Sequence, residues 1–426
     1  MSILGYLYIC IISVYVIKYA HKGTLFIFSP LLVYADLIFS DLLPLYLPQE
    51  KTIPPIMYVN THIAMIVNLI FLFYYRKLYL KKINVSISYF QYYKREKIRY
   101  ILLVLFILIY IISGIVSGTL TGLLRGEDME DMRRTGEIGV GFLRDIPAVG
   151  CEFLLLLIFI KYKWKKFILA GVVLLSVGLT FLVCSGGNRG ILLSFATIFL
   201  CYMAICYRGL KFYEYLAWKL GFNIIGAILN AIRQAETFTY YLLNFTWADA
   251  VCGYQNIVFN NSITLINVTK KYGFFYGQET LTNFTYFIPR FIWPEKPVSF
   301  GYKMKELAGY SFPGGGIMPS TIEYSYINWG NLWVVDYILW LIFLNYLYAK
   351  LIKIKDYKIK LFIILLLISV SYWAHVAKEL EVLLLLWIFL KFIYLIISPQ
   401  NVLKVWKNLH IIIYPQIVFK VWKKRQ

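Results

Sequence analysis

Charged residues are scarce in this sequence. Of its 426 residues, 15% are charged and 60% are hydrophobic, whereas a soluble domain carries about 25% charged residues. This composition excludes an ordinary soluble domain. The apolar residues are gathered in runs that approach the roughly 20 residues needed to cross a bilayer as a helix. The runs are continuous rather than alternating, so they favour helices over membrane strands.

Metal-binding patterns are also lacking. None of the six cysteines stands in the CxxC spacing of a metal site. The acidic segment 127–131 could chelate a divalent cation, but Arg133 and Arg134 follow it directly, which favours a solvated loop with internal ion pairs. We therefore expect no metal and no cofactor. An internal repeat is lacking too, which argues against a transporter built from two similar halves.

The apolar runs predict an all-α, polytopic integral membrane protein of about eleven (10–12) transmembrane helices. We expect residues 1–426 to form a single integral membrane domain. The predicted spans are 2–19, 25–47, 55–75, 100–122, 146–160, 167–184, 191–207, 220–234, 330–349, 361–376 and 380–398. Prolines 30, 44 and 48 predict an irregular outer end for the second span.

Basic residues outnumber acidic ones, 43 to 22, and give a formal net charge of +21. Most of them lie beside the predicted spans in the positive-inside pattern, so we expect membrane lipids rather than nucleic acid as partners. The segment 76–99 is strongly basic and is predicted to be cytoplasmic. The segment 401–426 mixes lysines with aromatic residues and is predicted to be a basic cytoplasmic tail on the membrane surface.

The longest predicted loop, 235–329, then falls on the outer side, and its charges nearly balance. Its stretch FIPRFIWPEKP, 287–297, cannot form one regular helix because Pro294 and Pro297 each lack a backbone donor. Such backbone is tolerated at membrane depth where it is buried in protein or lines a wet cavity. We expect it to cap an outward-facing cavity. Trp293 and the other rings of the loop suit either sugar stacking or an interfacial aromatic belt.

Several cations are predicted near this outer surface. Arg290 and Lys296 lie in the proline-rich stretch, and Arg189 lies in the tight hairpin SGGNRG. Backbone amides and an arginine at such a turn can bind an anion, although an arginine can also snorkel to the headgroups. Arg233 and Arg144 adjoin span ends on the same side. Together these residues predict a site for a diphosphate.

Two residues are candidates for a general base. Glu323 precedes the sequence NWG at the start of a span, where partial burial would make a carboxylate a stronger base. His375 lies near the outer end of a late span, and an unperturbed histidine, with a pKa of about 6.5, titrates near neutrality. The alternatives are an ion pair that merely holds the loop at Glu323, and an interfacial packing role for His375.

Three segments, taken in order, resemble the Wzy-type O-antigen polymerases, or oligosaccharide repeat-unit polymerases. SGGNRGILLSFA is similar to their arginine-bearing hairpin. IPRFIWPEKP is similar to the proline–arginine–tryptophan–lysine segment of their large outer loop. MPSTIEYSYINWGNLW is similar to the segment that follows, and it contains Glu323. The predicted topology agrees over nearly the whole chain.

The resemblance implies a fold like that of the glycosyltransferase C-type superfamily. It also implies transfer of a glycan chain from undecaprenyl diphosphate to the non-reducing end of a new repeat unit, without metal or nucleotide sugar. The reaction would take place at the outer, periplasmic face of the bacterial inner (cytoplasmic) membrane. The expected partners are the lipid-linked oligosaccharide, a chain-length regulator and a flippase. An O-antigen ligase or other glycan transferase, a flippase or exporter, and a structural scaffold remain as alternatives.

Overall fold

In the computed structural model the described residues form helices joined by turns and irregular segments, with no strand among them. These residues are 2–20, 29–47, 49, 51–79, 96–116, 141–162, 167–184, 251–278, 300–310 and 317–354, with scattered positions between 194 and 224 and at 285, 288, 292, 293, 295, 363 and 367. Three helices within them are long and apolar enough to cross a membrane, Pro55–Tyr79, Arg99–Val116 and Thr321–Lys353. Two shorter apolar helices are Ile3–Lys18 and Leu169–Cys184. These findings support a helical membrane protein, while most of four predicted spans, 191–207, 220–234, 361–376 and 380–398, lies outside the described residues.

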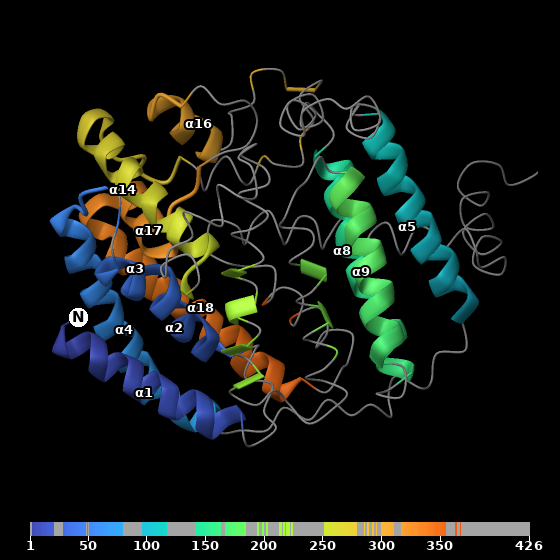
Figure 1. Cartoon of the computed structure of the whole chain (residues 1–426), viewed down its shortest axis with the longest axis horizontal. Helices are drawn as coiled ribbons and strands as arrows, with labels where there is room; N and C mark the ends of the chain where they lie inside the picture. Colours follow the sequence, from blue (N-terminus) through green and yellow to red (C-terminus); the bar gives the residue numbers. More distant parts are fainter. Residues whose placement is uncertain are drawn as a thin grey trace, which may run out of the picture.

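One group of helices contains the amino-terminal part of the chain (Figure 1). It consists of α1 (Ile3–Ala20), α2 (Pro30–Leu37), η2 (Ile38–Leu42), α3 (Leu43–Tyr46), α4 (Pro55–Tyr79) and α18 (Trp333–Lys353). The segments α2, η2 and α3 follow one another within the predicted span 25–47. The π-helical turn η2 interrupts the α-helix of this segment, and such turns are frequent at functional sites.

A second group consists of α5 (Glu96–Val116), α8 (Gly141–Tyr162) and α9 (Phe167–Cys184), on the right of Figure 1. Its helices pack closely because glycine leaves room for rings. A Cβ atom added at Gly150 of α8 would lie 2.6 Å from the ring of Phe106 on α5. The rings of Tyr110 and Phe181 stack with their centroids 3.8 Å apart and so join α5 to α9.

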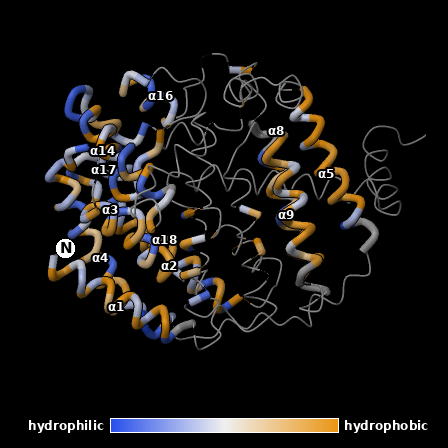
Figure 2. The backbone as a smooth tube through the Cα atoms, in the orientation of Figure 1, coloured by the Kyte–Doolittle hydropathy of each residue, from blue (hydrophilic) through white to orange (hydrophobic). Residues whose placement is uncertain are grey.

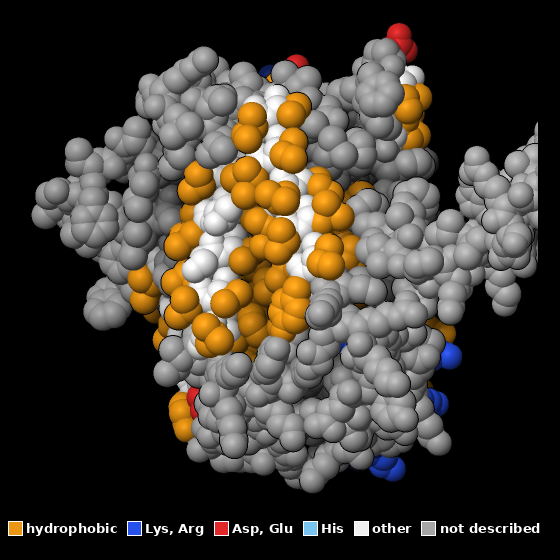
Figure 3. All heavy atoms as spheres, turned by 90° about the vertical axis from the view of Figure 1, so that its right-hand side faces the viewer, with side chains coloured by type: hydrophobic (Ala, Val, Ile, Leu, Met, Phe, Trp, Pro, Cys, Tyr) orange, Lys and Arg blue, Asp and Glu red, His pale blue; other side chains and the backbone are white. Residues whose placement is uncertain are grey.

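The outer surface of this second group is apolar. Figure 3 shows a continuous hydrophobic face on this side of the molecule. Its exposed side chains include Ile101, Val104, Leu108, Ile112, Ile115, Leu169, Val172, Leu175 and Leu179. A face of this kind is costly in water and is typical of a surface that contacts lipid.

Within the described residues, the predicted loop 235–329 contains three helices. They are α14 (Tyr254–Tyr272), α16 (Phe300–Leu307) and α17 (Thr321–Trp329). Figure 2 shows them as more hydrophilic than α5 and α9, so hydropathy alone does not reveal them. The apolar stripe Phe259, Ile263 and Ile266 of α14 packs on Leu45 and Met57.

Buried polar side chains join α1, α2, α4 and α18. They are Tyr8, Tyr34, Asn68, Tyr79, Tyr337 and Asn345. The Asn68 side chain accepts from the Tyr337 hydroxyl at 3.0 Å and donates to the Tyr8 hydroxyl at 3.0 Å. The Tyr79 hydroxyl donates to Asn345 Oδ1 at 2.5 Å. Interhelical bonds of this kind contribute about 0.6 to 2 kcal/mol each in lipid, so they fix the register of these helices.

Candidate functional site

Glu323 lies in the first turn of α17. Ser320 caps this helix, with its hydroxyl accepting from the Glu323 backbone N–H at 3.5 Å. At the other end Gly330 terminates α17 and leads through a short 3₁₀ turn into α18. The Glu323 side chain is 0% exposed, so burial is complete, where the sequence predicts partial burial.

A single hydrogen bond holds the Glu323 carboxyl group. Asn60 of α4 donates from Nδ2 to Glu323 Oε2 at 3.1 Å. The other oxygen, Oε1, has no hydrogen-bond partner. Among the described residues, no ion pair is found at Glu323. The arginine side chains predicted for the outer side lie outside the described part of the chain, so an ion pair that holds the loop stays an alternative for Glu323.

A second carboxyl group faces the same region. Asp41 lies in η2 and is also 0% exposed. Ser40 Oγ donates to Asp41 Oδ2 at 2.5 Å, while Oδ1 has no partner. The Ser320 hydroxyl lies beside this carboxyl group, and Asp41 is close enough to Glu323 for their charges to interact.

Helix α14 forms a hydrogen bond with Ser320, the N-cap residue of α17. Ser262 Oγ accepts from the Ser320 backbone N–H at 2.8 Å and donates to the Val258 carbonyl oxygen at 3.0 Å. The site is therefore assembled from α4, η2, α14 and α17, which come from distant parts of the sequence. We call the buried groups Asp41, Asn60, Ser320 and Glu323 the carboxyl site.

Sequence reasoning missed Asp41. The sequence carries a signal, because an acidic residue within a predicted span is costly and marks a functional position in many membrane proteins. The residue stands in the run IFSDLL. Its partner Glu323 is far away in the sequence, and no spacing rule connects the two.

The structure describes only some of the residues of the predicted site. Arg189, Arg233, Arg290, Lys296 and His375 lie outside the described residues, and so does the side chain of Arg144, in the first turn of α8. Trp293 is described and is 37% exposed. That exposure suits both of its alternatives, a sugar-stacking ring and an interfacial ring.

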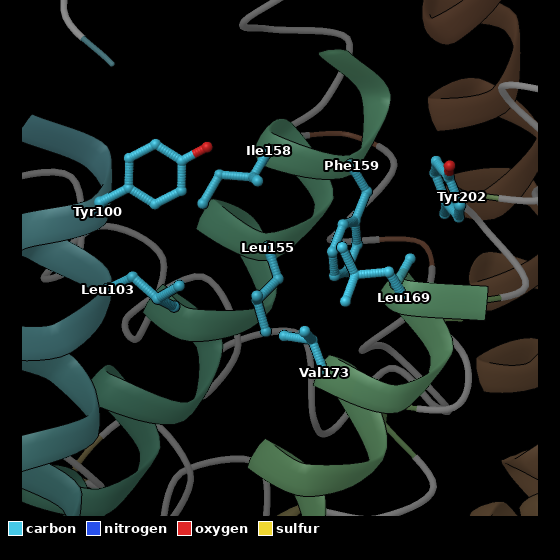
Figure 4. Close-up of a pocket in the computed structure, with 9 residues that line it drawn as sticks. Tyr100, Leu103, Leu155, Ile158, Phe159, Leu169, Val173 and Tyr202 are labelled. Atoms are coloured by element: carbon cyan, nitrogen blue, oxygen red, sulfur yellow. The ribbon is translucent and has the colours of Figure 1, made fainter. Parts of the chain in front are cut away.

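An apolar cavity of about 230 Å³ lies between α5, α8 and α9 (Figure 4). Its lining is Tyr100, Leu103, Leu155, Ile158, Phe159, Leu169, Ala170, Val173 and Tyr202. No charged group stands among its described lining residues. The described lining is suited to hydrocarbon.

Within the described ranges, no group of three or more His, Cys, Asp or Glu side chains could hold a metal ion. The carboxyl site has two such residues. Comparison of the chain with family models, with curated proteins and with solved structures gives no match. The functional argument therefore rests on the three sequence motifs and on the geometry of the carboxyl site.

Proposed function

We propose that this protein polymerises lipid-linked oligosaccharide repeat units. It would transfer a glycan chain from undecaprenyl diphosphate to the non-reducing end of a new repeat unit, at the outer face of the bacterial inner membrane. The observation that carries the proposal is the environment of Glu323. This residue belongs to the polymerase-like motif MPSTIEYSYINWGNLW, and its carboxyl group is buried with no cation beside it among the described residues.

The reaction needs two kinds of group. A hydroxyl oxygen of the acceptor sugar attacks the anomeric carbon of the donor, while the bond from that carbon to the lipid diphosphate breaks. The hydroxyl proton passes to a base, which we assign to Glu323, and the diphosphate departs as an anion. A carboxylate that is poorly solvated is a better proton acceptor than one in water.

Stabilisation of the leaving diphosphate is assigned to the cations of the outer side. Arg189 and Arg290 are the main candidates, supported by Lys296, Arg233 and Arg144. Arginine can bind phosphate oxygens with two parallel hydrogen bonds. Sugar binding is assigned to the aromatic residues of 235–329, among them Trp293.

The acceptor hydroxyl must be able to reach the Glu323 carboxyl group. The Glu323 carboxyl group is covered in this conformation, and its hydrogen bond to Asn60 links α17 to α4. The acceptor hydroxyl would take the place of the Asn60 amide when the contact between α4 and α17 opens. Exclusion of water from such a site strengthens its electrostatic contacts.

One experiment separates this function from its alternatives. The gene is deleted in its host, and the lengths of the surface glycan and of the lipid-linked glycan are measured. Surface glycan of a single repeat unit supports the polymerase. Lipid-linked polymer that never reaches its final acceptor would indicate a ligase, and repeat units trapped on the inner leaflet would indicate a flippase. Unchanged glycan would overturn all three.

A further inference from the structure

Within the part of the chain that the structure describes, the carboxyl site gathers two potential negative charges and no positive one. Asp41 and Glu323 are both 0% exposed, and no ion pair joins either of them to a described residue. An unpaired buried charge costs several kcal/mol even after the protein relaxes. Two like charges close together cost more, because each repels the other. The pair therefore needs a compensating positive species.

The unsatisfied atoms indicate which species fits. Asp41 Oδ1, Glu323 Oε1 and Asn60 Oδ1 are buried oxygens without a hydrogen-bond partner. Asn60 is 1% exposed, and its amide is directed into the site because its Nδ2 donates to Glu323. All three atoms are hydrogen-bond acceptors, so the site has fewer hydrogen-bond donors than acceptors. A bound proton supplies a donor as well as a positive charge.

Among the residues that the structure describes, the titratable groups next to the pair supply no cation. Tyr8 of α1 and Tyr337 of α18 lie close enough to Asp41 for charge interaction, and Tyr326 of α17 lies close to Glu323. Tyrosine is neutral near pH 7. Helix α14 contributes Ser262, which is uncharged, and α4 contributes Asn60.

We propose that Asp41 and Glu323 form a proton-binding site in which the pair holds at least one proton at neutral pH. A metal ion fits less well, because the site has two acidic side chains and, among the described residues, no third His, Cys, Asp or Glu joins them to form a metal-binding group. The site follows from burial, charge and unsatisfied acceptors, and it does not depend on which reaction the protein catalyses.

Infrared spectroscopy tests this directly. The full-length protein is placed in lipid nanodiscs, and the carbonyl stretch of protonated carboxyl groups is followed as the pH is stepped through neutrality. We expect this band in the wild-type protein and its loss in the double variant Asp41→Asn, Glu323→Gln. In each single variant the remaining carboxyl group has no like-charged neighbour, so it should release its proton at lower pH than the wild-type pair.

The matched control is Asp36→Asn. Asp36 lies one helical turn or so earlier, in α2, is 42% exposed, and pairs with Lys219 at 2.6 Å. Its carboxylate is paired with a lysine and lies outside the carboxyl site, so its removal should leave the band unchanged. Size-exclusion profiles check that each variant is folded. If the double variant fails to fold, the pH at which the single variants release their proton tests the proposal instead.

Two results would overturn the proposal. The first is a wild-type protein without a protonated-carboxyl band at neutral pH, or a band that persists in the double variant. The second is a band that appears only when metal ions, including sodium, are removed, because the site would then hold a metal cation. Neither result bears on polymerisation, which the deletion experiment tests separately.

Discussion

Glu323 combines full burial with a single hydrogen bond, from Asn60 at 3.1 Å. If it is the base, Glu323→Gln keeps the shape of the side chain and removes its ability to take a proton. We expect turnover to fall by about 10² to 10⁴-fold, the usual contribution of a general base. Donor binding should be retained. The measurement is polymer formation by purified protein on synthetic lipid-linked repeat units, with donor affinity measured separately.

The control for this variant is Glu306→Gln, on the exposed surface of α16, which should retain activity. His375→Ala is measured beside it. Near-normal turnover in Glu323→Gln together with an inactive His375→Ala would transfer the role of base to the histidine.

The arginines of the outer side act on the leaving group instead. A charge-assisted hydrogen bond contributes about 1.5 to 3 kcal/mol, so loss of one should cost roughly tenfold to a hundredfold in rate. We expect Arg189→Ala and Arg290→Ala to abolish long chains at normal protein level, and lysine to restore them only in part. Arg76→Ala, at the far end of α4, is the control. Long chains in both alanine variants would remove the diphosphate role.

At the scale of elements, the turn between α17 and α18 positions the carboxyl site. Gly330 has φ 56°, and a Cβ atom there would lie 2.8 Å from the Phe274 ring. Gly330→Ala should therefore lower the melting temperature and reduce activity. Gly273→Ala, with φ 83° and no atom within 4 Å, should show only the backbone strain of about 1 to 3 kcal/mol. Thermal unfolding in detergent compares them, with Gly221→Ala in open space as the control. An equal loss in Gly330→Ala and Gly273→Ala would show that the ring contact is unimportant.

Hydropathy predicts some of these elements closely and others not at all. The predicted span 167–184 has the same bounds as α9, and the predicted span 2–19 agrees with α1 to within one residue. A continuous apolar run of this length has few stable conformations other than a helix. Helix α14 was missed because it is amphipathic and polar, and its stripe gains stability only against Leu45 and Met57. Glu323 was identified through its motif. Asp41 was not, because its significance depends on a contact that only the tertiary structure creates.

At the scale of the whole molecule, the carboxyl site lies near the start of α4, and basic residues stand in the last turns of α4 and α1. Helix α4 has 25 residues, so it is about 37 Å long. Asn60 stands near its start, and Arg76 and Lys77 stand in its last turn. Helix α1 runs in the same direction, because Ser2 at its start bonds His62 at 2.7 Å. Lys18 in its last turn therefore falls at the basic end too.

This asymmetry predicts the orientation in the membrane. Basic ends of spans remain in the cytoplasm, so the end with the carboxyl site should face outward. In a background without native cysteines, Lys51→Cys and Ser311→Cys should react with an impermeant maleimide in intact cells, while Ser86→Cys should react only after permeabilisation. Lys51 reports the site end directly, because its Nζ bonds Thr264 Oγ1 of α14 at 2.8 Å. Labelling of position 86 in intact cells, with positions 51 and 311 protected, would place the carboxyl site in the cytoplasm. The donor would then have to be used before it is flipped across the membrane, and the proposed polymerisation at the outer face would be wrong.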